Sequence, residues 1–239
     1  MSDRRIGIIT ALIPEAKCFV KRKPVPGMIT PINGRISLCL CGMGAERAST
    51  AARKMIDAGF NALVSWGTAG ALSADIEPGS LIIPETICSR DGKVYHTAAR
   101  WRSSFIKQLQ DCPADIYLGQ LSDSIHVLTH GSEKYRVRQQ TDALAVDMES
   151  AAIAETARQN QTPFLAIRAI SDSATMSIPE SVTKFTGPYG DVRVLPLILS
   201  LLQRPSDIAA LITLARGFRA AARTLAWIGQ RRDAIFPMD

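Results

Sequence analysis

The sequence predicts a single α/β domain, a three-layer sandwich in which helices flank a mixed, twisted central sheet. Its length of 239 residues fits one large domain of this class. Short apolar, β-rich runs alternate with helical stretches, and residues 164–170 are apolar enough for a strand buried on both faces. Acidic residues follow such runs, at the strand ends where open α/β sheets bind ligands.

Composition indicates a folded cytoplasmic protein. Hydrophobic residues make up 46% of the chain and charged residues 21%, which allows a core and argues against disorder. The five cysteines are scattered, and Cys39 and Cys41 lack metal-site spacing, so we expect reduced thiols and no metal. No signal peptide is evident, and no apolar run approaches the ~18–20 residues that span a bilayer. The net charge of +6 comes without a nucleic-acid-binding motif, so we expect no nucleic-acid partner.

The individual elements follow from the alternation of apolar and helical runs. We expect strands at residues 5–9, 36–41, 62–66, 81–84 and 164–170, and helices that begin near Pro14, Ala45 and Ser150. Residues 67–71 (GTAGA) are predicted to be a glycine-rich turn, whose N–H groups and Thr68 hydroxyl bind an anion or a sugar oxygen. Lys134 and residues 136–138 are predicted to lie on a solvated helix face.

Four acidic residues stand at the ends of predicted strands: Glu15, Asp147, Glu149 and Asp172. Helix capping is one interpretation of these acids. Asp147 suits a cap for the helix that follows it, and Glu15 suits the positive end of a helix dipole. Capping does not account for the whole set, so we favour a ligand site.

We expect a main domain that carries these acids, residues 1–190, and an apolar, basic helical tail, residues 191–239, packed on the same domain. Residues 183–190 are predicted to be a loop, and residues 195–202 form an apolar run that ends before Arg204-Pro205. A helix is expected from Asp207 to Arg232, with Arg216, Arg219 and Arg223 on one face. This helix either packs on the body or a partner subunit, or contacts the inner face of the membrane.

Two stretches of the sequence carry a family resemblance. VDMESAAIA (146–154) followed by RAISDSA (168–174) resembles the paired signature of the nucleoside phosphorylase and nucleosidase superfamily, which cleaves N-glycosidic bonds of nucleosides. IGIITALIPEA (6–16) resembles the N-terminus of the methylthioadenosine/S-adenosylhomocysteine nucleosidases. The resemblance implies a nucleoside phosphorylase-like fold, a nucleoside substrate, no cofactor, and a homodimer whose second subunit completes the pocket for the 5′ substituent.

The same resemblance implies a role for each site residue. Asp172 would protonate the leaving purine at N7 with Ser171 orienting it, and burial behind Ile170 is expected to favour its protonated form. Glu15 would activate water. The substrate-binding residues would be Thr68 and Gly70 beneath the ribose, Met148 against the sugar, Glu149 at the ribose hydroxyls, and Asp147. His126 is interpreted as a surface or satisfied polar residue, with stacking on the base as the alternative.

The nucleophile is either water or phosphate. Phosphorylases of this superfamily place a phosphate-binding arginine where this chain has Ser65, and Arg47 and Arg90 are possible substitutes. Ser65 together with Glu15 favours water, with phosphate as a possible co-substrate.

The shortened middle of the chain and its Leu/Arg-rich C-terminus (LLQRP, then LITLARGFRAAARTLAWIG) resemble the hopanoid-associated branch of the superfamily. That resemblance implies adenosylhopane, a lipid-linked adenine nucleoside, as the substrate. The alternatives are a soluble methylthioadenosine/S-adenosylhomocysteine nucleosidase, a purine nucleoside phosphorylase, or a relative that binds a nucleoside or lipid without catalysis.

Overall fold

Strand β4 (Ala62–Ala71) is the centre of the sheet, because three strands pair with it in this computed structural model, which describes residues 4–191 and 207–236. β1 (Ile6–Thr10) and β11 (Phe164–Asp172) run parallel to β4, and β10 (Ala145–Asp147) pairs antiparallel with its last residues. Parallel and antiparallel pairs therefore occur in one sheet, which confirms the predicted mixed α/β fold.

The other strands extend the sheet on each side of this centre. On the β1 side, the next strands are β3 (Ile36–Leu40) and β2 (Ile29–Pro31). On the β10 side, they are β9 (Gln120–Asp123), β6 (Thr86–Cys88) and β7 (Val94–His96). On the β11 side, they are β5 (Leu81–Ile82) and β8 (Ile116–Tyr117).

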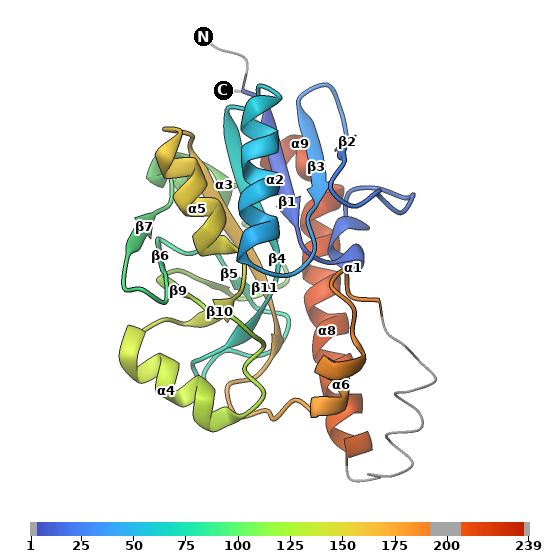
Figure 1. The fold of residues 1–239 in the computed structure, drawn as a ribbon, viewed down its shortest axis with the longest axis vertical. Helices are drawn as coiled ribbons and strands as arrows, with labels where there is room; N and C mark the ends of the chain where they lie inside the picture. The colour runs from blue at the N-terminus through green and yellow to red at the C-terminus, as the bar shows by residue number, and fades with distance from the viewer. Residues whose placement is uncertain (1–3, 192–206, 237–239) are drawn as a thin grey trace.

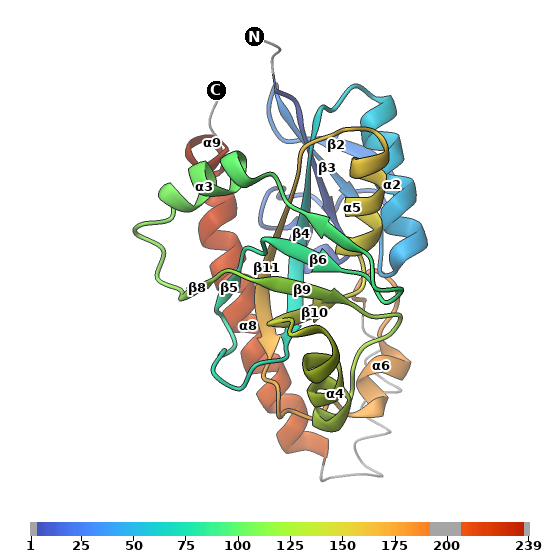
Figure 2. The same cartoon turned by 90° about the vertical axis from the view of Figure 1, so that its left-hand side faces the viewer.

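Helices cover both faces of the sheet (Figure 1). One face carries α2 (Ala45–Asp57) and α5 (Ser150–Gln159), and the opposite face carries α1 (Ile13–Ala16), α3 (Ala99–Lys107), α8 (Asp207–Gln230) and α9 (Arg232–Ile235). The helix starts predicted near Pro14, Ala45 and Ser150 are confirmed. Figure 2 shows α4 (Gly131–Thr141) and α6 (Glu180–Phe185) beyond the carboxyl end of β11. Among the described helices, none is long and apolar enough to cross a membrane.

The prediction of a turn at residues 67–71 is wrong, because these residues continue β4. Residues 67–70 pair with residues 168–172 of β11, and Ala71 pairs with Ala145 of β10. The glycines are needed because neighbouring side chains lie close to the backbone of β4, and not because the chain reverses direction there. A Cβ atom on Gly67 would lie 2.5 Å from Arg168 Nη1 and 2.7 Å from Glu15 Oε1, and one on Gly70 would lie 3.0 Å from Asp172 Oδ2.

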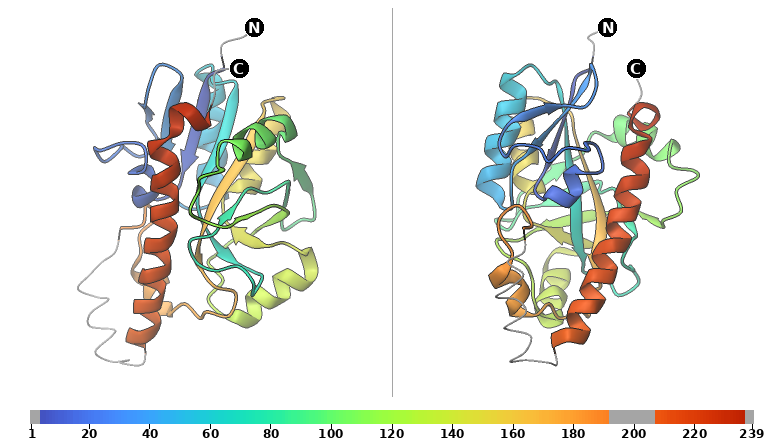
Figure 3. Two further views of the ribbon diagram at one scale, coloured as in Figure 1. Left: turned by 180° about the vertical axis from the view of Figure 1, so that it is seen from behind. Right: turned by 90° about the vertical axis from the view of Figure 1, so that its right-hand side faces the viewer.

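The helix α8 packs along β11 and runs the length of the molecule (Figure 3). Its buried stripe has small residues, and a Cβ atom on Gly217 would lie 2.2 Å from the carbonyl oxygen of Ser171. The helix ends at Gln230 and α9 follows, slightly short of the predicted end at Arg232. Part of the predicted loop, residues 183–185, is the last turn of α6. The predicted apolar run at 195–202 lies outside the described residues.

Candidate active site

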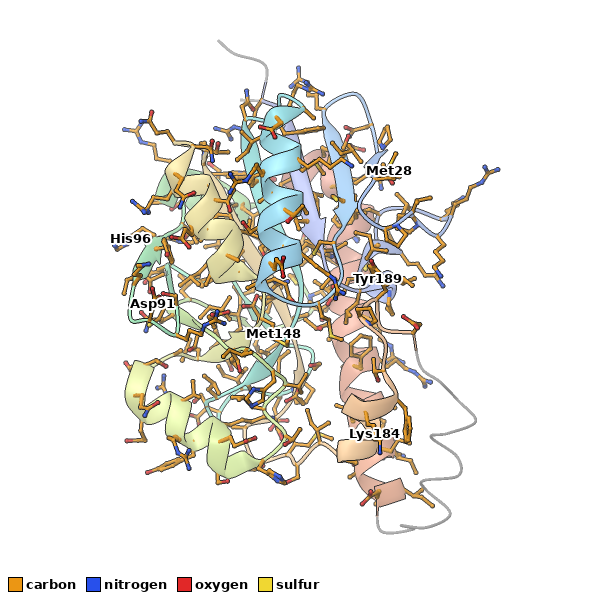
Figure 4. All side chains as sticks on the ribbon, in the orientation of Figure 1. Met28, Asp91, His96, Met148, Lys184 and Tyr189 are labelled. Atoms are coloured by element: carbon orange, nitrogen blue, oxygen red, sulfur yellow. The ribbon has the colours of Figure 1, made fainter. Side chains whose placement is uncertain are left out.

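All eight predicted site residues line one cavity at the carboxyl ends of β4, β10 and β11. They are Glu15, Thr68, Gly70, Asp147, Met148, Glu149, Ser171 and Asp172. The cavity has a volume of about 150 Å³, and its wall is completed by apolar side chains that include Leu12, Met43, Val127, Leu128 and Ile178. In Figure 4, Met148 lies near the middle of the molecule. Residues from distant parts of the sequence thus meet at the strand ends, where α/β sheets bind ligands.

Glu15 is held rigidly by four hydrogen bonds. Its Oε2 accepts from the Thr10 hydroxyl at 2.8 Å and from the Leu12 N–H at 3.0 Å. Its Oε1 accepts from the Thr68 N–H at 2.8 Å and from the Thr68 hydroxyl at 3.0 Å. The Thr68 donors predicted to bind an anion or a sugar oxygen are therefore taken by a carboxylate. Their effect is to fix the position of Glu15 in the cavity wall.

Glu149 lies at the start of α5 and is 8% exposed. Its Oε1 accepts a hydrogen bond from the N–H of Gly44 at 2.8 Å. Among the described residues no partner contacts its other carboxyl oxygen, which leaves that oxygen for a ligand. Burial, followed by the nearby charge of Asp147, raises the pKa of Glu149 from 4.5 to about 8.

Asp172 has a donor at each carboxyl oxygen. Ser171 donates to Oδ1 at 2.7 Å, as the sequence indicates, and the ammonium of Lys134 donates to Oδ2. Lys134 is 1% exposed, so its predicted position on a solvated helix face is wrong. Its helix directs the Lys134 face inward, because Val137, one turn later, packs against a small apolar cluster with Leu72. Both carboxyl oxygens of Asp172 are therefore hydrogen-bond acceptors.

Asp147 forms a buried ion pair with Arg168. The Nε of Arg168 donates to Asp147 Oδ2 at 2.7 Å, and its Nη2 donates to Ser65 Oγ at 2.6 Å and Ser150 Oγ at 3.1 Å. Asp147 also accepts a hydrogen bond from the N–H of Ser150 at the start of α5. This contact agrees with the interpretation of Asp147 as a helix cap. Ser65 therefore belongs to a network that neutralises and positions the floor of the site.

The arginines considered for phosphate binding do not line the cavity. Arg47 is exposed on α2 and donates to the carbonyl oxygen of Met43 at 3.3 Å. Arg90 lies 3.7 Å from Asp123, a buried acid whose pKa is raised to about 6 by burial and by Asp147. His126 lines the cavity and is exposed at its mouth, which fits both of its interpretations.

One side of the cavity is held by the segment after α6. The carbonyl oxygens of Pro188 and Tyr189 accept from the N–H groups of Met43 and Ile13, at 2.8 and 3.0 Å. Figure 4 labels Tyr189. Within the described part of the chain, no group of three or more His, Cys, Asp or Glu side chains has the arrangement of a metal site.

Two site residues were not predicted from the sequence, Lys134 and Arg168. Arg168 had a signal, since a charged residue inside a strand buried on both faces requires a buried partner. Lys134 had a weaker one, its helical spacing from the apolar Val137. Neither signal names the partner, because the partner comes from a different segment.

Curated proteins with similar sequences include nucleosidases and a phosphorylase. The DeoD-type purine nucleoside phosphorylase of Streptococcus gordonii is 26% identical over 173 residues, which cover 67% of this chain and 73% of that protein. The 5′-methylthioadenosine/S-adenosylhomocysteine nucleosidase of Maridesulfovibrio salexigens is 26% identical over 231 residues, which cover 83% of this chain and 99% of that protein. The enzyme of the same name from Buchnera aphidicola is 30% identical over 145 residues, which cover 52% of this chain and 56% of that protein.

Solved structures share the fold over nearly the whole chain. The nucleosidase of the same name from Neisseria meningitidis, in complex with methylthio-immucillin-A, has a TM-score of 0.74 at 18% identity and covers 97% of this chain and 99% of its own. Futalosine hydrolase of Helicobacter pylori has a TM-score of 0.70 at 16% identity, covering 95% of this chain and 96% of its own. The family model of the phosphorylase superfamily matches residues 2–187. With the cavity and its acids inside that match, this chain belongs to the phosphorylase superfamily.

Proposed function

We propose that this chain hydrolyses the N-glycosidic bond of an adenine nucleoside. The observation that carries the proposal is the meeting of Glu15, Glu149 and Asp172 around one cavity. Two of the curated relatives named above are nucleosidases, which supports the same class of reaction. A protein that only bound nucleosides would have no need for three buried carboxyl groups whose partners hold them in fixed orientations.

Each acid has one task in this reaction. Cleavage passes through a sugar cation similar to that of glycoside hydrolysis. Asp172 protonates N7, so the purine leaves as a neutral molecule. The free carboxyl oxygen of Glu149 accepts hydrogen bonds from the ribose hydroxyls, and Glu15 takes a proton from the water that attacks the anomeric carbon.

The charge of the cavity favours water over phosphate. Its described lining has four carboxyl residues, while its basic residues are Lys134 and His126, and Lys134 is already paired with Asp172. A phosphate dianion would meet like charges with no free arginine beside it. The position used by phosphorylases for arginine is Ser65, which accepts a hydrogen bond from the structural Arg168.

The test is the identity of the sugar product. The purified chain is incubated with an adenine nucleoside and phosphate, and both products are measured by mass spectrometry. We expect adenine and a free ribosyl product, with Asp172→Asn as the inactive control. A ribosyl 1-phosphate would contradict hydrolysis while leaving N-glycosidic cleavage intact.

We further propose that the nucleoside is adenosylhopane. The branch-specific C-terminal sequence supports it. A C30 hydrocarbon on the 5′ carbon would extend out of the cavity through its mouth, where the exposed His126 lies. Ile125, which is 67% exposed between two cavity-lining residues, offers an apolar surface there. Faster adenine release from methylthioadenosine than from adenosylhopane would favour the alternative that the curated nucleosidases suggest.

A lipid-linked substrate requires contact with the membrane, and α8 offers a surface for it. Its outward stripe has Ile208 and Ile212, 44% and 47% exposed, followed by the exposed Arg216, Arg219 and Arg223. Each arginine near an anionic surface contributes about 1 kcal/mol.

The membrane proposal is tested by flotation with anionic liposomes at low and high salt. We expect a triple variant, in which Arg216, Arg219 and Arg223 of α8 are changed to glutamine, to float less than the wild type at low salt. The matched control changes the exposed Arg22, Arg53 and Arg136 to glutamine, which removes the same charge elsewhere. Equal flotation of both triple variants would refute attachment through α8.

We also propose a homodimer, in which the second subunit covers the apolar mouth near Ile125. Light scattering of the purified chain tests this proposal. A monomer at high protein concentration would refute it.

A further inference from the structure

Lys134 is a charged residue buried beside the proposed acid. Its ammonium donates to Asp172 Oδ2 and, at 2.7 Å, to the carbonyl oxygen of Ser173. The side chain is 1% exposed, and burying an ammonium is costly unless its partners compensate. Such a cost points to a task beyond anchoring α4, since a pair of apolar residues at positions 134 and 172 would pack without it.

The contacts of Asp172 conflict with the simplest mechanism for this residue. Its Oδ2 accepts a hydrogen bond from Lys134 and its Oδ1 accepts one from Ser171, so both carboxyl oxygens are acceptors. Protonation of a purine requires a carboxyl group that donates a proton. The proton nearest to Asp172 Oδ2 in this geometry is the one on Nζ of Lys134.

We propose that Lys134 supplies the proton that Asp172 delivers to the leaving purine. This inference rests on the proposed function, in which Asp172 is the acid. When a bound purine excludes water, transfer of the proton from Nζ to the carboxylate removes two buried charges, which a low dielectric favours. Asp172 then acts as a neutral acid at the moment when it is needed.

The proton balance closes over one turnover. Asp172 gives its proton to N7, and the bond from C1′ to the base breaks with its electron pair passing to the base. Water adds to C1′ and gives a proton to Glu15, which leaves a neutral nucleoside-derived sugar, neutral adenine and a neutral Lys134. Solvent then returns a proton to Lys134 and removes the proton from Glu15.

Other titratable or charged groups surround the pair from the neighbouring elements. They are Glu15 on α1, His126 and His130 before α4, Asp147 and Glu149 after β10, and Arg168 on β11. Because these groups are the same in every variant below, the comparison among variants at position 134 isolates the effect of the lysine.

The experiment compares Lys134→Arg with Lys134→Met across pH. Arginine keeps the positive charge but cannot give up its proton in a protein. We expect both variants to lose ~10²–10⁴-fold in kcat near pH 7.5, the typical worth of a proton-transfer group. Lys134→Met should regain activity as the pH falls, because solvent then protonates Asp172, whereas Lys134→Arg should not. Arg136→Met, exposed on the same helix, serves as the control with wild-type rates.

Each outcome decides the inference. Wild-type kcat in Lys134→Arg would overturn it, because charge and hydrogen bonding would then suffice. A Lys134→Met profile parallel to that of the wild type would overturn it as well. Should the methionine variant not fold by circular dichroism, Lys134→Gln, which keeps a donor, takes its place with the same expectation. A wild-type chain that releases no adenine from any nucleoside would refute the proposed function itself, and the inference with it.

Discussion

Replacing Glu149 with glutamine is expected to stabilise the protein at alkaline pH while it impairs catalysis. Glutamine has nearly the same shape and keeps an oxygen for the hydrogen bond from the N–H of Gly44. It removes the ability to carry a negative charge in a buried position beside Asp147. The effect of Glu149 on the free energy of unfolding can thus be measured separately from its effect on the rate of the reaction.

The magnitude follows from the pKa of Glu149, which rises from 4.5 to about 8. Each pKa unit corresponds to ~1.4 kcal/mol, so the full cost of charging the folded protein is about 5 kcal/mol. Below pH 4.5 the group is protonated in both folded and unfolded chains, and its stability contribution is fully present. That contribution is lost as the pH rises, and the loss is complete above pH 8.

The assay is urea unfolding of the wild type and Glu149→Gln at several pH values from 6 to 8.5. The free energy of unfolding of the variant should exceed that of the wild type by an amount that grows by ~1.4 kcal/mol per pH unit up to pH 8. Adenine release should fall roughly fivefold to a hundredfold, because an amide NH₂ replaces the oxygen that would accept from the ribose hydroxyls and leaves them without an acceptor, at a cost of ~1–3 kcal/mol. Glu155→Gln, on the same helix with a side chain 40% exposed, is the control. Parallel stability curves for Glu149→Gln and the wild type would refute the reasoning.

Three further changes test the packing and the acids. Asp172→Asn should lower kcat by ~10²–10⁴-fold, measured as adenine release, and should also lower the urea unfolding midpoint, because it leaves the buried ammonium of Lys134 without its counter-charge. Gly217→Ala should destabilise the protein by ~1–3 kcal/mol in urea unfolding, because its Cβ would lie 2.2 Å from the oxygen of Ser171, whereas Gly34→Ala, with open space around it, should be neutral. Asp123→Asn should stabilise the protein at pH 8 but not at pH 3.5, because burial raises the pKa of this carboxyl from 3.8 to about 6 and its stability contribution is lost as the pH rises through that range.

Most of the fold could be predicted from the sequence because its strands are short, apolar and separated by helices. The helix starts at Ala45 and Ser150 were found from local patterns alone. The extension of β4 through residues 67–71 was not, because two glycines in five residues look like a turn. Their reason is steric and non-local, since the side chains of Glu15 and Arg168 occupy the space in which a Cβ would lie on Gly67.

The candidate site divides in the same way. Glu15, Glu149 and Asp172 could be placed together because each follows a recognisable strand and carries a family motif. Lys134 could not be placed there, because its neighbours in the sequence are mostly polar and its partner, Asp172, is 38 positions away. A sequence therefore identifies the candidate acid more readily than it identifies the lysine that contacts it.

The basic C-terminal helix illustrates how one pattern serves two demands. Its buried stripe packs on the body of the protein and consists of Gly217, Ala221, Thr224, Leu225, Ile228 and Gly229. Gly217 places α8 directly against Ser171, the neighbour of Asp172. The Neisseria structure covers 97% of this chain, so α8 is part of the shared fold rather than an appendage. Packing explains the buried stripe, but it does not explain three exposed arginines in line with Ile212. A membrane role can therefore be tested only by changing that outward stripe, since deleting the helix would remove one wall behind the active site.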